Sequence, residues 1–120
     1  VTGGAGFVGS HMVRCLVEAQ REVVVVDDLS DGRTEALPEG VPLVVGDIGD
    51  PSVLERVFRR HDIDSVVHFA ARIQVGESVV DPRLTWRTNV AGTIALLDAV
   101  LDAGVQRFVF SSSGPVYVNP

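Results

Sequence analysis

The stretch VTGGAGFVGSH, residues 1–11, decides the fold, because it places three glycines where a strand would pass into a helix. Gly3, Gly6 and Gly9 are spaced three residues apart. In such a turn the first glycine permits a tight bend, the second lets the backbone approach a phosphate, and the third allows close helix–strand packing. Backbone N–H groups and the positive helix end then receive the anion. The pattern predicts a phosphate-binding turn.

Only Val1 and Thr2 precede this turn, and the chain does not begin with methionine. We therefore expect a piece of a longer protein, with its first strand cut short. Four further apolar runs, 22–27, 42–47, 65–70 and 107–112, predict continuous buried strands. Helices are expected over 7–20, 51–61 and 81–104, with a loop over 29–40. The predicted apolar stripe of the first helix is Val8, Met12, Cys15, Leu16 and Ala19.

Strands that alternate with helices indicate βαβ units and an α/β fold, with a parallel sheet covered on both faces. We expect a doubly wound sheet of strand order 3-2-1-4-5, truncated in the first strand and after the fifth. Ligands of such sheets bind beyond the carboxyl ends of the strands. Asp50-Pro51 and Asp81-Pro82 predict helix starts, and Gly104 predicts the end of the longest helix.

Composition narrows the possible functions. The 120 residues suffice for one domain, and a net charge of −6 argues against nucleic acid or an anionic membrane as partner. No apolar run approaches the ~18 residues of a membrane span. The single cysteine, Cys15, rules out an internal disulfide and suits a reducing cytoplasm, and we expect it to be a small buried hydrophobe.

Two acids follow the glycine turn at the ends of the next two strands. Asp27 follows Gly9 at close to the ~20-residue spacing expected of a ribose-binding acid. A carboxylate at that position accepts a hydrogen bond from the adenosine 2′-hydroxyl and repels a 2′-phosphate. This favours NAD over NADP, although Asp27 could merely cap a turn. Asp47 could reach the adenine amine, with Ile48 packing on the ring, or it could simply cap its loop.

Other polar residues leave alternatives open. Asn89 and Gly92 interrupt a helix, where glycine costs on the order of 1 kcal/mol relative to alanine, so they suggest contact with another backbone or a cofactor, or a tolerated irregularity. Ser111, Ser112 and Ser113 end the last strand at the ligand edge, or serve a turn. His68 is interpreted as a satisfied core histidine. Neither metal-ligand spacing nor a hydrolase G-x-S-x-G elbow is present.

Six segments together resemble a known family: TGGAGFVGSH (2–11), DDLSDG (27–32), GDIGD (46–50), VVHFAARIQVGESV (66–79), NVAGT (89–93) and FVFSSS (108–113). They are similar to the extended short-chain dehydrogenase/reductases, most closely the NAD-dependent UDP-glucose 4-epimerases. The resemblance implies a partial Rossmann-type NAD-binding domain over residues 1–120. It also implies a cytoplasmic, homodimeric isomerase of galactose metabolism that interconverts UDP-glucose and UDP-galactose through a 4-keto intermediate.

The resemblance also implies roles for individual residues. Ser113 would hydrogen-bond the sugar's reacting oxygen and is the one catalytic residue expected here. The implied NAD contacts are Gly3, Gly6, Phe7, Val8 and Gly9 at the pyrophosphate, Asp27 and Asp28 at the adenosine ribose, Asp47 and Ile48 at adenine, Phe69, Ala70 and Ala71 at the nicotinamide side, and Asn89 and Ser111.

The sequence departs from the family in several places. Family enzymes use a tyrosine and, four residues later, a lysine; this chain has only Tyr117, too close to Ser113, and no lysine. We expect that pair beyond Pro120 and the chain alone to be inactive. Ile73 stands where many members carry lysine, and Gly114-Pro115 and Val118 are also unusual. Two alternatives therefore remain: another nucleotide-sugar dehydratase or reductase, and a non-catalytic dinucleotide-binding module.

Overall fold

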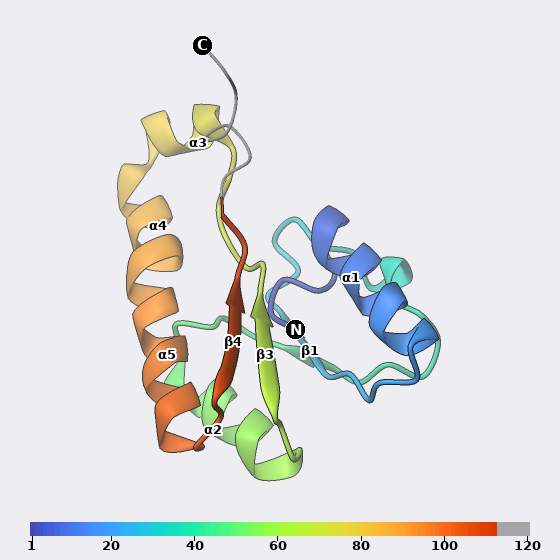
Figure 1. The fold of residues 1–120 in the computed structure, drawn as a ribbon. Coiled ribbons are helices and arrows are strands. Elements are labelled where there is room, and N and C mark those ends of the chain that lie inside the picture. Colours follow the sequence, from blue (N-terminus) through green and yellow to red (C-terminus); the bar gives the residue numbers. More distant parts are fainter. Residues whose placement is uncertain (113–120) are drawn as a thin grey trace.

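A computed structural model describes residues 1–112 of the chain (Figure 1). The expectations for Ser113, Gly114-Pro115, Tyr117 and Val118 therefore lie outside the described residues. The elements in chain order are α1 (Phe7–Glu18), β1 (Val25–Asp27), a 3₁₀ turn η1 (Thr34–Ala36), β2 (Leu43–Val45), α2 (Pro51–Arg60), β3 (Ser65–His68), α3 (Val75–Val80), α4 (Pro82–Trp86), a π-helical turn η2 (Arg87–Gly92), α5 (Thr93–Asp102) and β4 (Arg107–Phe110).

The strands pair in parallel, as predicted. β1 pairs with β2 in the register Val26↔Val44, and β3 pairs with β4 in the register Val67↔Val109. Thr2 lies between the two ladders and forms single parallel bridges to Val26 and to His68. The chain therefore runs β2, β1, Thr2, β3, β4 across the molecule, while a continuous sheet in the order 3-2-1-4-5 stays a prediction.

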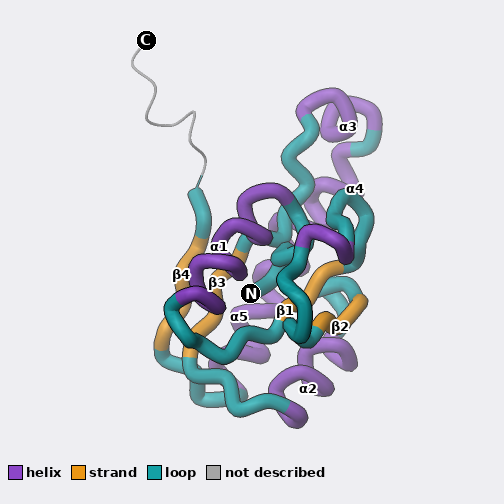
Figure 2. The backbone as a smooth tube through the Cα atoms, turned by 90° about the vertical axis from the view of Figure 1, so that its right-hand side faces the viewer, coloured by secondary structure: helices purple, strands orange, loops and turns teal. Residues whose placement is uncertain are grey.

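Helices cover both faces of β1, which confirms the two-sided α/β arrangement. Successive strand residues point to opposite faces. Val25 packs with Val13 of α1, whereas Val26 packs with Val53 of α2. Figure 1 shows α1 on one side of β3 and β4 and α5 on the other, and Figure 2 shows the N-terminus between the β1–β2 pair and the β3–β4 pair. A second core joins α2, β3 and α5 through Leu54, Val66, Leu96, Val100 and Val105.

The prediction that four strands are continuously buried holds only for β1. All three residues of β1 are buried, whereas those of β2 are half-buried or exposed. In β4, Phe108 packs on the core, but Val109 is 56% exposed and Phe110 is 58% exposed. The physical reason is coverage: within residues 1–112, α5 shields one face of β4 and its other face is open.

The predicted apolar stripe of α1 is only partly correct: Leu16 packs on the core cluster of Val13, Val23 and Val25, but other members of the stripe are exposed. The buried residues are Gly9, Ser10 and Val13, whereas Val8 is 60% exposed and Cys15 is exposed. Cys15 is therefore not the buried hydrophobe that was expected. The rotation of the helix follows from the turn, because Gly9 packs directly against the Gly3 backbone. Residues one turn further along the helix lie on the same face as Gly9 and therefore also point to the core.

Both predicted Asp-Pro helix starts are confirmed. The Asp50 carboxylate accepts from Ser52 N at 2.9 Å, and that of Asp81 accepts from Leu84 N at 3.2 Å. The bonds from Ser52 lower the pKa of Asp50 below its ordinary value. The long helix ends before Gly104, whose φ is +71°. It is not uniform, because η2 widens into a π turn between α4 and α5. None of the helices within residues 1–112 is long and apolar enough to cross a membrane.

Candidate functional site

A groove opens at the carboxyl ends of β1, β2 and β3, beside the glycine turn. This is the edge at which parallel sheets of this kind bind ligands. The loops that follow the three strands supply most of its wall. The lining residues are Gly3, Gly6, Val26, Asp27, Asp28, Ser30, Asp31, Gly32, Gly46, Asp47, Ile48, Phe69, Ala70, Ala71, Arg72 and Thr88.

A wider cavity lies at the opposite end of the strands. Its volume is about 400 Å³, against about 90 Å³ for the groove. It is lined by core residues such as Val24, Val66 and Leu96, and only Val1 and Thr2 lie between β1 and β3 there. We assign the site to the narrower groove, because the wider cavity is a packing gap beside the short first segment and holds none of the predicted site residues.

The glycine turn has the geometry that its spacing predicts. Gly3 adopts a φ of +67°, and a Cβ there would lie 2.6 Å from Ala70 N. A Cβ at Gly9 would lie 2.1 Å from Gly3 O, so the helix approaches the turn as closely as expected. Gly6 lines the groove, and a Cβ there would meet only Gly3 O at 3.4 Å. Its contact with a pyrophosphate stays a prediction.

Asp27 joins the glycine turn to the loop after β1. Its side chain is buried, and Oδ2 accepts from Ala5 N at 2.9 Å while Oδ1 accepts from Leu29 N at 2.9 Å. The second bond holds Leu29 at a φ of +58°, a left-handed conformation that is unusual for a branched side chain. Asp27 therefore caps its turn, as one of the two alternatives predicted, and the same residue also lines the groove.

Asp28 and Asp47 also bond within their own loops. The Asp28 carboxylate accepts from Ser30 N at 2.9 Å and from Ser30 Oγ at 2.6 Å. The Asp47 Oδ1 accepts from Gly49 N at 2.8 Å, so one of the two carboxylate oxygens caps the loop, as the second alternative predicted. Ile48 is 3% exposed and packs with the core as well as lining the groove. Contacts of Asp28, Asp47 and Ile48 with a ligand stay predictions.

The long helix meets the groove at the π turn η2. Asn89 Oδ1 accepts from Arg72 N at 2.7 Å, and Asn89 Nδ2 donates to Arg72 O at 2.9 Å. The predicted contact of Asn89 with another backbone is confirmed. A Cβ at Gly92 would lie 3.2 Å from the Ile48 side chain, so the small residue admits Ile48 against the helix. Thr88, which the sequence analysis did not single out, lines the groove in place of Asn89.

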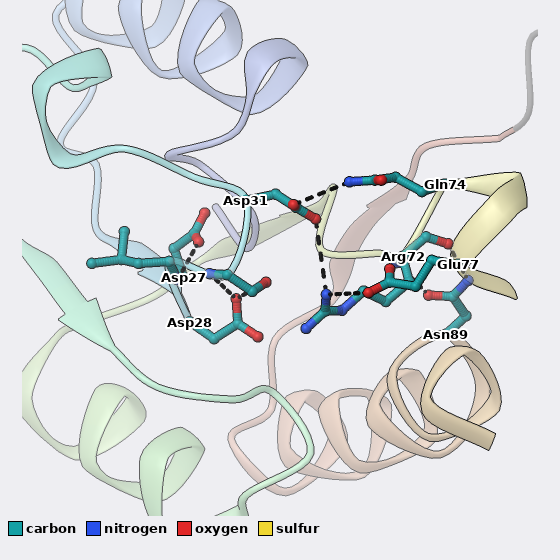
Figure 3. Close-up of polar contacts among 9 residues, drawn as sticks. Asp27, Asp28, Asp31, Arg72, Gln74, Glu77 and Asn89 are labelled. Carbon is teal, nitrogen blue, oxygen red and sulfur yellow. Dashed lines mark hydrogen bonds and ion pairs between the residues drawn. The ribbon is translucent and has the colours of Figure 1, made fainter. Parts of the chain in front are cut away.

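Arg72 is the second residue that sequence reasoning missed. Its Nη1 lies 3.4 Å from Glu77 Oε1 and 4.0 Å from Asp31 Oδ2, and Gln74 Nε2 donates to Asp31 Oδ1 at 3.2 Å. These contacts connect the loop after β3 with the loop after β1 (Figure 3). The adjacent Ile73, which stands where many family members carry lysine, is 83% exposed. The signal available in the sequence was an arginine just beyond the predicted strand 65–70.

The remaining predicted site residues are divided between the groove and its surroundings. Phe69, Ala70 and Ala71 line the groove as expected. Phe7 and Val8 lie on the first turn of α1, are 83% and 60% exposed, and are outside the lining. The Ser111 Oγ donates to His68 O at 2.9 Å, so it ties the end of β4 to β3. Its contact with a cofactor, like that of Phe7 and Val8, stays a prediction.

His68 is a satisfied core histidine, as interpreted from the sequence. It is 3% exposed; Nδ1 lies 2.6 Å from Thr2 Oγ1 and Nε2 lies 3.1 Å from Thr93 Oγ1. Burial lowers the pKa of His68 below its ordinary value, so the ring is neutral in the fold at pH 7. Among residues 1–112, no three His, Cys, Asp or Glu side chains are grouped as a metal site would require.

Parallel strands between helices, with a glycine turn and an acid meeting at their carboxyl edge, define a Rossmann-like α/β domain. A family model described as the NAD dependent epimerase/dehydratase family matches residues 1–120. The chain belongs to this family.

Relatives extend the comparison over the whole chain. The UDP-glucose 4-epimerases of Azospirillum brasilense and Streptomyces lividans are each 52% identical over all of it, while the match covers 34% and 37% of those proteins. A solved Thermus thermophilus UDP-glucose 4-epimerase in complex with NAD has a TM-score of 0.91 at 43% identity, covering 94% of this chain and 36% of that one. A Thermotoga maritima UDP-glucose 4-epimerase with UDP-glucose also has a TM-score of 0.91, at 42% identity, covering 94% of this chain and 37% of that one. The chain thus spans about a third of the length of the curated relatives it matches.

Proposed function

We propose that residues 1–120 form the NAD-binding part of an enzyme that interconverts UDP-glucose and UDP-galactose. The observation that carries the proposal is the bond between Ala5 N and Asp27 Oδ2, at 2.9 Å. It places a buried carboxylate directly beside the glycine turn, where a ribose would follow the pyrophosphate of a dinucleotide. The names of the 52% identical relatives and the NAD complex of a similar structure support the same assignment.

The residues of the groove suit NAD. The turn leaves space in front of Gly6, and the amino end of the twelve-residue helix α1 offers its N–H groups to a phosphate. Asp27 would accept from the adenosine ribose and Asp28 would lie beside it. Asp47 and Ile48 would contact adenine, and Phe69, Ala70 and Ala71 would face the nicotinamide side. NAD held by these residues would supply hydride transfer at the sugar C4.

The acids of the groove also favour NAD over NADP. Asp27, Asp28, Asp31 and Asp47 all line it. A 2′-phosphate on the adenosine ribose would meet this negative charge, and an ion brought close to like charges is strongly disfavoured where water is partly excluded. Arg33 lies on the exposed side of the same loop, outside the lining.

We further propose that the protein acts as a cytoplasmic homodimer. An exposed apolar stripe follows α4, η2 and α5, and it consists of Trp86, Val90, Ile94, Leu97 and Leu101. Contiguous apolar surface of this kind marks an interaction face. The single cysteine suits a reducing compartment. Light scattering of the full-length protein and of its Ile94→Glu variant tests the dimer, which the variant is expected to dissociate.

The cofactor proposal is tested by titrating the full-length protein with NAD and NADP. Asp27→Ala removes the carboxylate that would bind the ribose, so NAD affinity is expected to fall about 10- to 100-fold. The matched control is Asp64→Ala, because Asp64 pairs with Arg107 on the surface and lies outside the groove. Unchanged NAD affinity in Asp27→Ala would remove the ribose assignment.

Product analysis with UDP-glucose and UDP-galactose tests the reaction. Interconversion of the two sugars is expected. A dehydrated keto-sugar product would instead identify a nucleotide-sugar dehydratase. NAD binding without turnover of either sugar would leave a dinucleotide-binding module.

A further inference from the structure

We propose that Arg72 binds the pyrophosphate of the cofactor, and that Asp31 and Glu77 hold its guanidinium until the phosphates replace them. The inference rests on the NAD-binding role proposed above. It adds the residue that supplies the positive charge and a pair of carboxylates that compete for it.

The charge of the groove calls for such a residue. Four carboxylates line it, those of Asp27, Asp28, Asp31 and Asp47, and Arg72 is the single cation among the lining residues in the described part of the chain. A pyrophosphate bridge brings two further negative charges. The helix end offers only partial charge, which is weaker than a guanidinium at short range. Arg72 is therefore the lining side chain whose charge can offset that of a bound pyrophosphate.

The backbone brings Arg72 to the right place. The Asn89 side chain bonds to the Arg72 backbone twice, because Oδ1 accepts from Arg72 N at 2.7 Å and Nδ2 donates to Arg72 O at 2.9 Å. Two residues earlier, Ala70 N lies within 2.6 Å of where a Gly3 Cβ would be, so the loop after β3 lies against the glycine turn. Phosphates received by that turn are thus close to the loop that carries Arg72. The Arg72 side chain is 17% exposed and reaches across to the loop of Asp31 (Figure 3).

The present partners of the guanidinium hold it loosely. Charge-assisted N–H···O bonds are about 2.7–2.9 Å long. The Arg72 Nη1 distances of 3.4 Å to Glu77 and 4.0 Å to Asp31 are longer than this. Both contacts use Nη1, so within residues 1–112 the planar fork of the guanidinium makes no bidentate pair. A phosphate accepts two parallel bonds from such a fork and would bind it better.

Glu77 shows a second sign of an incomplete arrangement. Its Oε2 is buried and has no hydrogen-bond partner among the described residues, although Oε1 faces Arg72. An unpartnered buried carboxylate oxygen is costly. Hydrogen bonding is therefore incomplete in the cluster formed by Asp31, Arg72, Gln74 and Glu77. Replacing a carboxylate by a phosphate at the Arg72 guanidinium would cost little binding energy.

Asp31 and Arg72 then have opposite effects on binding. Arg72→Ala removes the attraction and is expected to weaken NAD affinity about 10- to 100-fold. Asp31→Asn keeps the shape of the side chain but removes a charge that competes for Arg72 and repels the phosphates. It is expected to tighten NAD binding by about 2- to 10-fold.

The experiment measures dissociation constants of NAD, ADP-ribose and adenosine for the full-length protein by calorimetry and competition. Arg72→Ala should weaken NAD and ADP-ribose alike and leave adenosine unchanged, and Arg72→Lys should recover part of the loss. Arg59→Ala is the matched control, because Arg59 pairs with Glu55 on the surface of α2 at 2.8 Å and lies outside the groove. It removes the same charge and should change nothing.

The outcomes separate this inference from the NAD proposal. If the unsubstituted protein binds NAD and Arg72→Ala binds it equally well, the inference is overturned while the NAD proposal stands. Equal losses for NAD and adenosine in Arg72→Ala would show a structural role and overturn it too. Failure of the unsubstituted protein to bind NAD would overturn both. Weaker binding in Asp31→Asn would contradict the proposed competition.

Discussion

Asn89 holds Arg72 by both of its backbone polar groups, accepting from Arg72 N at 2.7 Å and donating to Arg72 O at 2.9 Å. Asn89 lies in the π turn that separates α4 from α5, and such turns occur frequently at functional sites. From this turn the Asn89 amide reaches the loop after β3. The position of the groove wall is thus determined by a helix far from it in sequence.

Replacement of Asn89 tests this link. Asn89→Leu leaves both Arg72 backbone groups without their partner and is expected to lower the free energy of unfolding by about 1–3 kcal/mol. Asn89→Asp keeps an acceptor for Arg72 N and loses only the donor, so its effect should be smaller. Urea unfolding of the full-length variants measures both, and equal stability of Asn89→Leu and the unsubstituted protein would show that the pair contributes nothing.

Gly9→Ala tests the close approach of α1 to the turn. The added Cβ would lie 2.1 Å from Gly3 O, so turn and helix must separate. Overpacking of this kind costs about 1–3 kcal/mol, and the displaced turn should also weaken NAD binding. Gly76→Ala is the control: nothing lies within 4 Å of its Cβ position in α3, and alanine is the better helix former there. Gly9→Ala is expected to lower both the thermal midpoint and the NAD affinity, whereas Gly76→Ala should lower neither.

The buried His68 makes stability depend on pH. Burial lowers its pKa from the ordinary value of 6.5, so below that pH the unfolded chain takes up a proton that the folded chain does not. Stability is therefore complete above about pH 6.5 and falls as the pH drops below it. His68→Gln removes this titration while keeping a polar group beside Thr2 and Thr93.

Denaturant midpoints between pH 7.5 and 5.5 provide the measurement. The difference between the two ends of the range should shrink in His68→Gln. His11→Gln is the control, since His11 lies on the exposed side of α1. A pH profile that is the same in His68→Gln and in the unsubstituted protein would contradict the assignment.

Gln20 offers a route to higher stability. It follows α1 with a φ of +58°, a left-handed conformation that costs a residue with a Cβ about 1 kcal/mol. Gln20→Gly is expected to raise the free energy of unfolding by about that amount. The same change at Gln106, where φ is not positive, should lower stability slightly, because glycine adds freedom to the unfolded chain. Chemical unfolding distinguishes the two.

Local patterns explain why much of the site was predictable. Gly3, Gly9 and Asp27 have their expected places because a tight turn, a close helix contact and a strand end each require a particular residue type within a short stretch. Asp50 and Asp81 cap helices for the same reason, each bonding to an N–H a few residues ahead. Such signals depend on neighbours in sequence, and they survive in any tertiary context.

Burial was less predictable, since it depends on which elements pack together. The apolar run of β4 reads like that of β1, yet Val109 and Phe110 are exposed while Val25 and Val26 are buried. In α1, the contact of Gly9 with Gly3 sets the rotation of the helix and leaves Cys15 exposed. No periodicity within either segment contains this information.

The sequence by itself determined the α/β class, the glycine turn and the acid that follows it, because each is encoded within a few neighbouring residues. Only the tertiary structure decided that Arg72 lines the same groove as four carboxylates and that Asn89 binds the Arg72 backbone. Asp31, Arg72 and Asn89 are far apart in the chain. Their meeting depends on parallel strands that end at one edge and on a helix whose π turn reaches that edge.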